Sequence, residues 1–366
     1  MSKAAELANL IGNINAGGGG VNRNVIINGA MNVAQRGTSS TGVGASSGYF
    51  VCDRWNFYAN GTDGRVTITQ DSSAPEGFAN SLKIATTTAD TSVAAGEQVM
   101  LMQRIEGQNL QHFKKGTSNA NPWALSFYVK GNASATYIAE LLDNDNSSRH
   151  VGKAFNVTTD WTRVEITFPA DTTGTLDDDT AASIDFSIHL HNGSTFTSGT
   201  LQETWGALAQ ANRGVGGSSI LDSTSRTFFI TGVQLEVGQN PTEFEHEPYE
   251  RTTEKCQRYF LHFGYGGNAL LGTASYYRAN LVILSVWFPT QMRAAPSVVE
   301  NLGSTGNQSF IVYTEDDADY VSSTNIARQG LYGCHLEIGN GSGTVGHSGS
   351  GTIQYADQSV QFNAEL

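Results

Sequence analysis

Short stretches of alternating apolar and polar residues recur along most of the chain. The segments 162–168 and 183–190 alternate with a period of two residues, which predicts strands with one buried face. The segment 281–288 is an apolar run with the length of a core strand. Clusters of Gly, Asn and Asp, which favour turns, separate such segments. The pattern therefore predicts a mostly β protein built from many short strands.

Two segments predict short helices instead. Residues 3–14 carry apolar side chains at steps of three and four residues, which gives one apolar stripe. The stripe consists of Ala4, Leu7, Leu10, Ile11 and Ile14. A helix this short is not stable alone in water, so we expect it to dock on copies of itself or on another surface. The alternative is a disordered terminus.

The second helix candidate, residues 249–260, follows Pro248 and marks a domain junction. The expected order is a docking helix with a glycine hinge at 1–20 and a jelly-roll β-sandwich at 21–248. The linker helix at 249–260 and a smaller β-sandwich at 261–366 follow.

The net charge and the length of the apolar runs argue against two kinds of partner, nucleic acids and membranes. The formal net charge is −13, which disfavours binding to the polyanions DNA and RNA. No apolar run reaches the roughly 18 residues that a membrane span needs, so we expect no membrane insertion. The N-terminus also lacks the apolar core of a signal peptide, which predicts synthesis in a cytosol.

The three cysteines, Cys52, Cys256 and Cys334, are far apart in the sequence. Their spacing is not that of a metal knuckle or a redox pair, and an odd number argues against a disulfide framework. We expect reduced, buried thiols.

Three parts of the chain carry further motifs, which in chain order are 28–37 (NGAMNVAQRG) with 52–55 (CDRW), then 229–238 (FITGVQLEVG) with 242–245 (TEFE), then 256–259 (CQRY) with 286–289 (VWFP) and 292–296 (MRAAP). Together these motifs resemble those of phage tail-fibre and related virion appendage proteins that contain a jelly roll like that of carbohydrate-binding modules. Within the first part, Arg36 and Asp53 are candidates for an ion pair between the opening strands, and Trp55 for a core residue.

The resemblance implies a trimeric component of the virion that contacts the host surface, with a glycan as the expected partner. The protein would be made in the host cytoplasm and attached to other virion proteins through its N-terminus. Leu7, Leu10, Ile11 and Ile14 would then form the virion-docking face.

A glycan site needs aromatic faces for the sugar rings and polar groups for their hydroxyls. The candidates are the cluster Tyr276, Tyr277 and Arg278, together with Trp205. Adjacent residues of a strand face opposite ways, so at least one of the two tyrosines should leave the core.

Candidate cation ligands occur in two places. Asp143 and Asp145 offer oxygen atoms at alternate positions, as a structural Ca²⁺ site requires, and the resemblance also implies a calcium ion. The alternative is a solvated turn. His189 and His191 share one strand face, which suits a transition metal, but without a third ligand nearby in sequence we expect surface histidines.

The acidic residues are scattered along the chain and cannot be paired from sequence. We therefore expect no catalytic residues and no enzyme. Two alternatives remain. The chain could be a capsid-decorating or head-fibre protein that binds no receptor, or a depolymerase that cleaves host polysaccharide.

Overall fold

The computed structural model describes residues 2–15, 22–263, 269–301, 310–313, 318–321, 324–339, 341–353 and 358–366. The chain divides into two compact units, Met1–Thr252 and Thr253–Leu366. The division falls inside helix α3 (Tyr249–Gln257), within the segment predicted as a linker helix.

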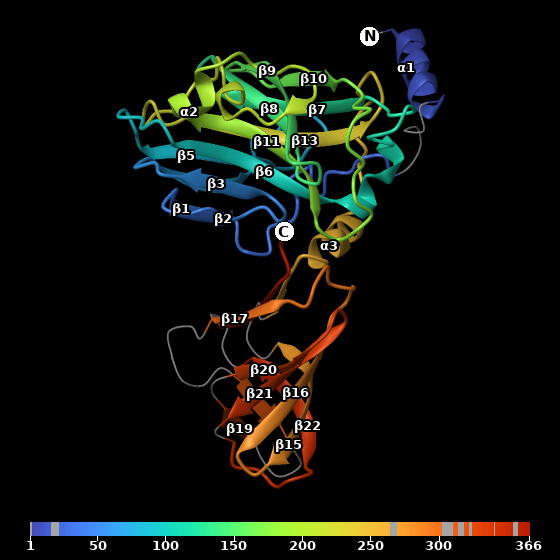
Figure 1. Cartoon of the computed structure of the whole chain (residues 1–366). Helices are drawn as coiled ribbons and strands as arrows, with labels where there is room; N and C mark the ends of the chain where they lie inside the picture. Colours follow the sequence, from blue (N-terminus) through green and yellow to red (C-terminus); the bar gives the residue numbers. More distant parts are fainter. Residues whose placement is uncertain are drawn as a thin grey trace. The chain divides into compact units, whose positions relative to one another are not determined.

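Two antiparallel sheets form most of the first unit (Figure 1). Sheet 1 has the order β1 (Ser39–Val43), β4 (Arg65–Asp71), β5 (Ser81–Thr88), β13 (Thr227–Val237), β7 (Trp123–Gly131), β10 (Thr162–Phe168). Sheet 2 has the order β12 (Gly206–Ala207), β9 (Arg149–Val157), β8 (Ala135–Asp143), β11 (Ala182–Asn192), β6 (Gln98–Glu106), β3 (Asn56–Asn60), β2 (Gly48–Tyr49). The chain crosses repeatedly between the sheets from β5 to β13, as in a jelly-roll sandwich.

The core of this unit is made by one face of each sheet. In β11 the side chains of Ile184, Phe186 and Ile188 are fully buried in the same apolar cluster as Leu125 and Phe127 of β7. The predicted alternation is therefore real, because a pleated strand sends alternate side chains to opposite faces. The prediction of one exposed face is wrong for β11, since its polar side chains are buried too.

The turn at residues 28–37 replaces the predicted opening strand. The Asn28 side-chain amide donates to the carbonyl oxygens of Val33 and Asp53, at 2.8 and 3.0 Å. The predicted ion pair exists, with Arg36 Nη1 3.7 Å from Asp53 Oδ1. Trp55 lies in the core, as predicted, and its indole Nε1 donates to Asn28 O. Side chains therefore tie this turn to the segment before β3.

The helices are short. The described part of α1 runs from Lys3 to Asn15, close to the predicted 3–14. The others are α2 (Ser194–Thr197), α3 and the 3₁₀ turns η1 (Gly107–Asn109), η2 (Gln111–Phe113) and η3 (Gln210–Asn212). Among the described residues, no helix has the length and apolar character needed to cross a membrane. The predicted hinge at Gly17–Gly20 lies outside the described residues.

The second unit also contains two antiparallel sheets. Sheet 3 has the order β14 (Phe260–Phe263), β23 (Ser359–Asn363), β17 (Ser297–Asn301). Sheet 4 has the order β19 (Ala318–Val321), β18 (Phe310–Tyr313), β22 (Ser348–Ile353), β15 (Leu270–Arg278), β16 (Leu281–Trp287), β21 (Gly333–Gly339), β20 (Thr324–Gln329). Both sheets contribute to one apolar cluster, in which Leu284 of β16 and Phe362 of β23 are fully buried. The predicted fold class, mostly β with two sandwich units and a short N-terminal helix, is confirmed.

All three cysteines are free and buried, as expected.

Candidate functional site

The structure separates the two predicted tyrosines. Tyr277 is 61% exposed, and the Arg278 guanidinium carbon lies 5.7 Å from its ring centroid. Tyr276 is only 2% exposed, because alternate residues of β15 face the core of the second unit. Tyr276 is therefore corrected from a surface candidate to a core residue, whereas the expectation that one tyrosine leaves the core holds.

Trp205 belongs to the first unit and is half-buried against its core. Its indole Nε1 donates to Pro169 O at 2.9 Å, and Lys115 Nζ lies 5.2 Å from the ring centroid. The ring thus covers a buried ammonium group. This environment differs from that of an open stacking platform, so we do not include Trp205 in the candidate site.

The predicted calcium ligand Asp143 already holds a cation of the protein. Its carboxylate forms a short ion pair with Lys115 Nζ, and both side chains are completely buried. The ammonium group also lies 3.2 Å from Asp171 Oδ2 and donates to Gly174 O at 2.9 Å. The Asp145 carboxylate accepts from the backbone N–H of Asp177. Calcium at this loop stays a prediction, and an ion coordinated by Asp143 would have to displace Lys115.

An open cleft lies on the second unit, at the ends of β16, β20 and β21. Its volume is about 350 Å³, within the roughly 300–1,000 Å³ of small-molecule sites. Two large aromatic side chains line it, Trp287 at 74% exposure and Tyr332 at 59%. Arg328, Gln329 and His335 supply its polar lining.

The backbone around the cleft is fixed by hydrogen bonds. Within the turn between β20 and β21, the Gly330 N–H donates to Gly333 O at 2.9 Å. Phe288 N–H donates to Tyr332 O at 2.9 Å, which joins this turn to the end of β16. Trp287 is paired with Gly333, where an added Cβ would lie 3.5 Å from Trp287 Cε3 and 2.5 Å from Val286 O. A glycine is therefore needed beside the indole.

Within the described residues, the polar side chains that line the cleft have no hydrogen-bond or ion-pair partner. Arg328 pairs across the sheet with His335, and His335 pairs with Ser285, so all three belong to one row. Within the described part of the chain, the side chains of Arg328, Gln329 and His335 make no hydrogen bond or ion pair. Exposed rings beside unused hydrogen-bonding groups can bind a ligand that has both apolar and polar faces.

Sequence reasoning placed Trp287 in a core strand because it continues the apolar run 281–288. The burial of β16 alternates, with Val282, Leu284 and Val286 inward and Trp287 outward. The period of two residues could have revealed this. Tyr332 lies in a turn, where no periodicity applies.

A buried charge cluster occupies the outer face of sheet 2 in the first unit. Glu140 accepts hydrogen bonds from Arg213, with Nη2 2.6 Å from Oε2. The imidazoles of His150 and His189 each lie 2.9 Å from one of its carboxylate oxygens. Burial opposes the charge of Glu140, but His189 and Arg213 together with these hydrogen bonds hold its pKa well below the usual range.

Asp185 lies on the same face of sheet 2 as Glu140, diagonally across the pair of strands β8 and β11. Burial raises the pKa of Asp185 to about 6, although Arg104, 3.8 Å away, favours the charged form. The predicted surface positions of His189 and His191 are wrong. Both side chains are fully buried and hydrogen-bonded.

No protein-family model and no curated protein matches the sequence. Among solved structures, the family 11 carbohydrate-binding module from Clostridium thermocellum, in complex with a mixed-linked β-1,3-1,4 tetrasaccharide, is 14% identical. That match covers 57% of this chain and 98% of the module, with a TM-score of 0.29.

A family 30 carbohydrate-binding module is 12% identical over 62% of this chain and 91% of its own length, with a TM-score of 0.29. The enzymatically active domain of tailspike protein 4 of bacteriophage CBA120 is 13% identical over 59% of this chain and 21% of that chain, also with a TM-score of 0.29.

Proposed function

We propose that this chain is a non-catalytic, glycan-binding protein of the virion-appendage type, and that its second unit binds the glycan in the cleft at Trp287. The single observation that carries the proposal is the cleft itself. There two strongly exposed aromatic rings stand beside Arg328, Gln329 and His335, none of which has a partner within the described residues.

The chemistry of a sugar fits this surface. An indole left in water exposes a large apolar area, and stacking against the C–H face of a pyranose ring removes part of it from water. The guanidinium of Arg328 and the amide of Gln329 can donate to sugar hydroxyls or to a carboxylate of an acidic sugar. The cleft is open, so an internal segment of a polysaccharide can enter as well as a chain end.

Catalysis by the carboxylates of the first unit is the competing proposal. Glu140 and Asp185 have pKa values that are shifted in opposite directions, which is typical of acid and base pairs. The side chain of Glu140, however, has no exposed surface, and both of its oxygens accept hydrogen bonds from Arg213. We therefore infer that Glu140 positions Arg213 and stabilises the fold.

Attachment to the virion is the second half of the proposal, and α1 is the proposed docking element. Leu7 and Ile11 are 57% and 48% exposed, so this helix has apolar side chains that other copies or another virion protein can cover. The side chains of Leu10 and Ile14 lie outside the described residues. Three copies in one appendage would turn a weak glycan contact into a strong one through avidity.

The glycan proposal is tested by substituting Trp287→Ala and measuring binding to a glycan array and to host-surface polysaccharide by affinity electrophoresis. We expect a loss of about 10- to 100-fold, the usual effect of removing a central aromatic contact. Tyr277→Ala is the matched control, because Tyr277 is also a strongly exposed aromatic residue of the same sheet but does not line the cleft. Both side chains are exposed, so neither variant should change the melting temperature.

Two results would reject the proposed site: no glycan binding by the wild-type chain, or undiminished binding by Trp287→Ala. A third result that would reject the site comes from light scattering on the same proteins. If the Trp287→Ala substitution dissociates an oligomer, the cleft is an interface between subunits.

The docking proposal is tested separately, with a chain that lacks residues 2–15. We expect the shortened chain to bind glycan as a purified protein but to be missing from assembled virions, as judged by immunogold labelling. Full incorporation of the shortened chain would exclude α1 as the attachment element. Wild-type label on the capsid, without glycan binding, would favour the head-fibre alternative.

A further inference from the structure

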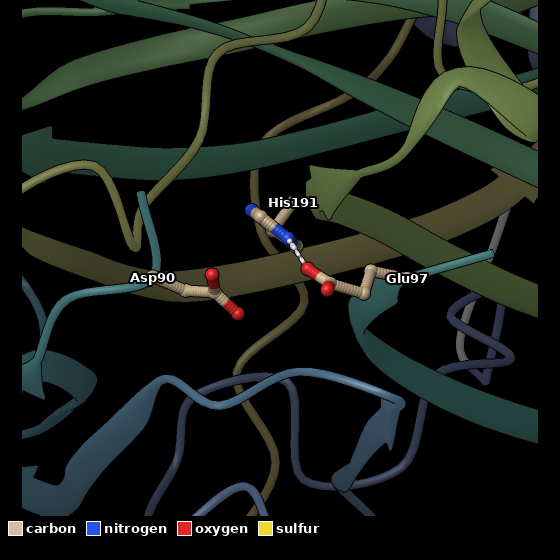
Figure 2. A group of neighbouring side chains, drawn as sticks. All are labelled: Asp90, Glu97 and His191. Atoms are coloured by element: carbon tan, nitrogen blue, oxygen red, sulfur yellow. Dashed lines mark hydrogen bonds and ion pairs between the residues drawn. The ribbon is translucent and has the colours of Figure 1, made fainter. Parts of the chain in front are cut away.

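Three potential metal ligands converge at one end of sheet 2 in the first unit (Figure 2). Asp90 follows β5, Glu97 immediately precedes β6, and His191 lies near the end of β11. Each offers one ligand atom, and these atoms all lie within 4.8 Å of one another. His191 is fully buried, and Asp90 and Glu97 are each 5% exposed.

The charges at this place do not balance without a further cation. Six other buried carboxylates of the first unit have a lysine or arginine partner. The pairs are Asp53 with Arg36, Glu140 with Arg213, Asp143 with Lys115, Asp171 with Arg149, Asp185 with Arg104 and Glu236 with Arg23. Among the described residues, Asp90 and Glu97 have no such partner and share only the imidazole of His191. Burial opposes the charge of Asp90, but hydrogen bonds from Thr62, Asp63 and Ser92 hold its pKa below the usual value. A bound cation would balance the net negative charge that remains on the two carboxylates.

Surrounding groups already orient the three ligand atoms. Ser219 Oγ lies 2.7 Å from His191 Nδ1 and accepts from the backbone N–H of Leu221 at 3.0 Å. This contact fixes the imidazole, so its other nitrogen, Nε2, faces the carboxylates (Figure 2). A histidine held in this way through its second nitrogen is typical of metal sites.

Both carboxylates are held as well. Thr62 Oγ1 and the backbone N–H of Asp63 donate to Asp90 Oδ2, at 2.7 and 2.8 Å. The Ala94 N–H donates to Glu97 Oε1 at 2.8 Å, which leaves Glu97 Oε2 directed at His191. The backbone of the loop is joined to the chain beyond β11, since Gly193 N–H donates to Glu97 O at 2.7 Å.

We propose that Asp90, Glu97 and His191 bind a divalent ion of the zinc class, with water in the remaining position. Calcium prefers six to eight oxygen ligands, whereas an imidazole nitrogen with two carboxylates suits Zn²⁺. His191 Nε2 and Glu97 Oε2 are 3.1 Å apart. Two ligands of a tetrahedral ion with bonds of about 2.0 Å would be about 3.3 Å apart.

The ion would have a structural effect that is independent of glycan binding. It would join the loop between β5 and β6, which carries Asp90 and Glu97, to the end of β11, which carries His191 and lies about 90 residues further along the chain. Because the ligands are buried, the ion would be retained through desalting.

The test uses the full chain, incubated with Zn²⁺, desalted and analysed by mass spectrometry for bound metal. We expect one zinc ion per chain. We also expect removal of the ion with EDTA to lower the melting temperature by about 5–10 °C, the shift for a site nearly saturated with ligand. Replacement by Co²⁺ should give visible absorption bands, which report coordination directly and do not depend on any variant.

Glu97→Gln and Asp90→Asn keep the shape of each ligand but remove its charge, and both should abolish retention of zinc. Asp185→Asn is the matched control, because Asp185 is a buried carboxylate of the same sheet that is paired with Arg104. The Asp185→Asn variant should retain zinc fully. Three results would overturn the proposal: a folded wild-type chain without zinc and without response to EDTA, retention undiminished in Glu97→Gln, or calcium displacing zinc at equal concentration. If a variant does not fold, the zinc and Co²⁺ measurements on the wild-type chain decide.

Discussion

Arg213 and Glu140 form a buried ion pair, with Nη2 of the arginine 2.6 Å from Oε2 of the glutamate. Glu140 belongs to β8, whereas Arg213 belongs to the long connection between β11 and β13. The pair therefore holds this connection over the outer face of sheet 2. It explains why polar residues such as His189 are buried on that face.

The first prediction concerns this pair. Glu140→Gln should lower the free energy of unfolding by about 3–5 kcal/mol at neutral pH, because it leaves Arg213 charged and buried without its partner. Urea denaturation measures the change. Glu203→Gln is the control, because Glu203 pairs with Lys153 at the surface, where an ion pair contributes about 0–1 kcal/mol. Equal losses in the two variants would contradict a structural role for Glu140.

The second prediction concerns pH. Burial raises the pKa of Asp185 from 3.8 to about 6, so the native state holds this proton more tightly than the unfolded state does. The contribution of Asp185 to stability therefore falls as pH rises from about 4 to about 6. The Asp185→Asn variant lacks the ionisable group and so does not lose this stability. The free energy of unfolding of the variant should therefore increase relative to that of the wild type as the pH rises. The difference should reach about 3 kcal/mol near pH 7, since one pKa unit corresponds to about 1.4 kcal/mol. Urea denaturation of both proteins across this range tests the sign, and a constant difference would disprove the raised pKa.

The third prediction compares two tryptophans in one core. The indole Nε1 of Trp55 donates to Asn28 O at 3.1 Å, whereas Nε1 of Trp123 is buried without a partner within the described residues. Phenylalanine at either position removes a similar volume, but only Trp55→Phe removes a hydrogen bond. Trp55→Phe should therefore cost about 1–2 kcal/mol more than Trp123→Phe. Thermal denaturation of the two variants measures this difference, and a larger loss for Trp123→Phe would show that its Nε1 has a partner, such as a bound water.

The fourth prediction concerns the floor of the cleft. Burial raises the pKa of the Cys334 thiol to about 12, and burial also raises the pKa of Cys52. The thiolate is the reactive form, so we expect almost no alkylation of the native protein near pH 8. All three cysteines should react after unfolding in guanidinium chloride. Rapid modification of Cys334 in the native protein, located by peptide mapping, would show that the cleft opens far enough to expose this thiol.

The sequence indicated the strands well and the functional groups only in part. Alternation in β10 and β11 marked real strands, because the pleat sends neighbouring side chains to opposite faces whatever the partner strand is. The same rule predicted that one of Tyr276 and Tyr277 leaves the core, but only the structure showed that it is Tyr277. It could not predict that Lys115 enters the Asp143 site, 28 residues away along the chain.

By itself, the sequence determined the fold class, the approximate position of the junction between the units, the buried thiols and the negative net charge. These properties depend on local periodicity and composition. Only the tertiary structure decided which acids are paired, that the outer face of sheet 2 is covered, and that Asp90, Glu97 and His191 meet. The reason is that strand register and loop placement depend on burial summed over whole sheets, so contacts between distant residues have no local signature.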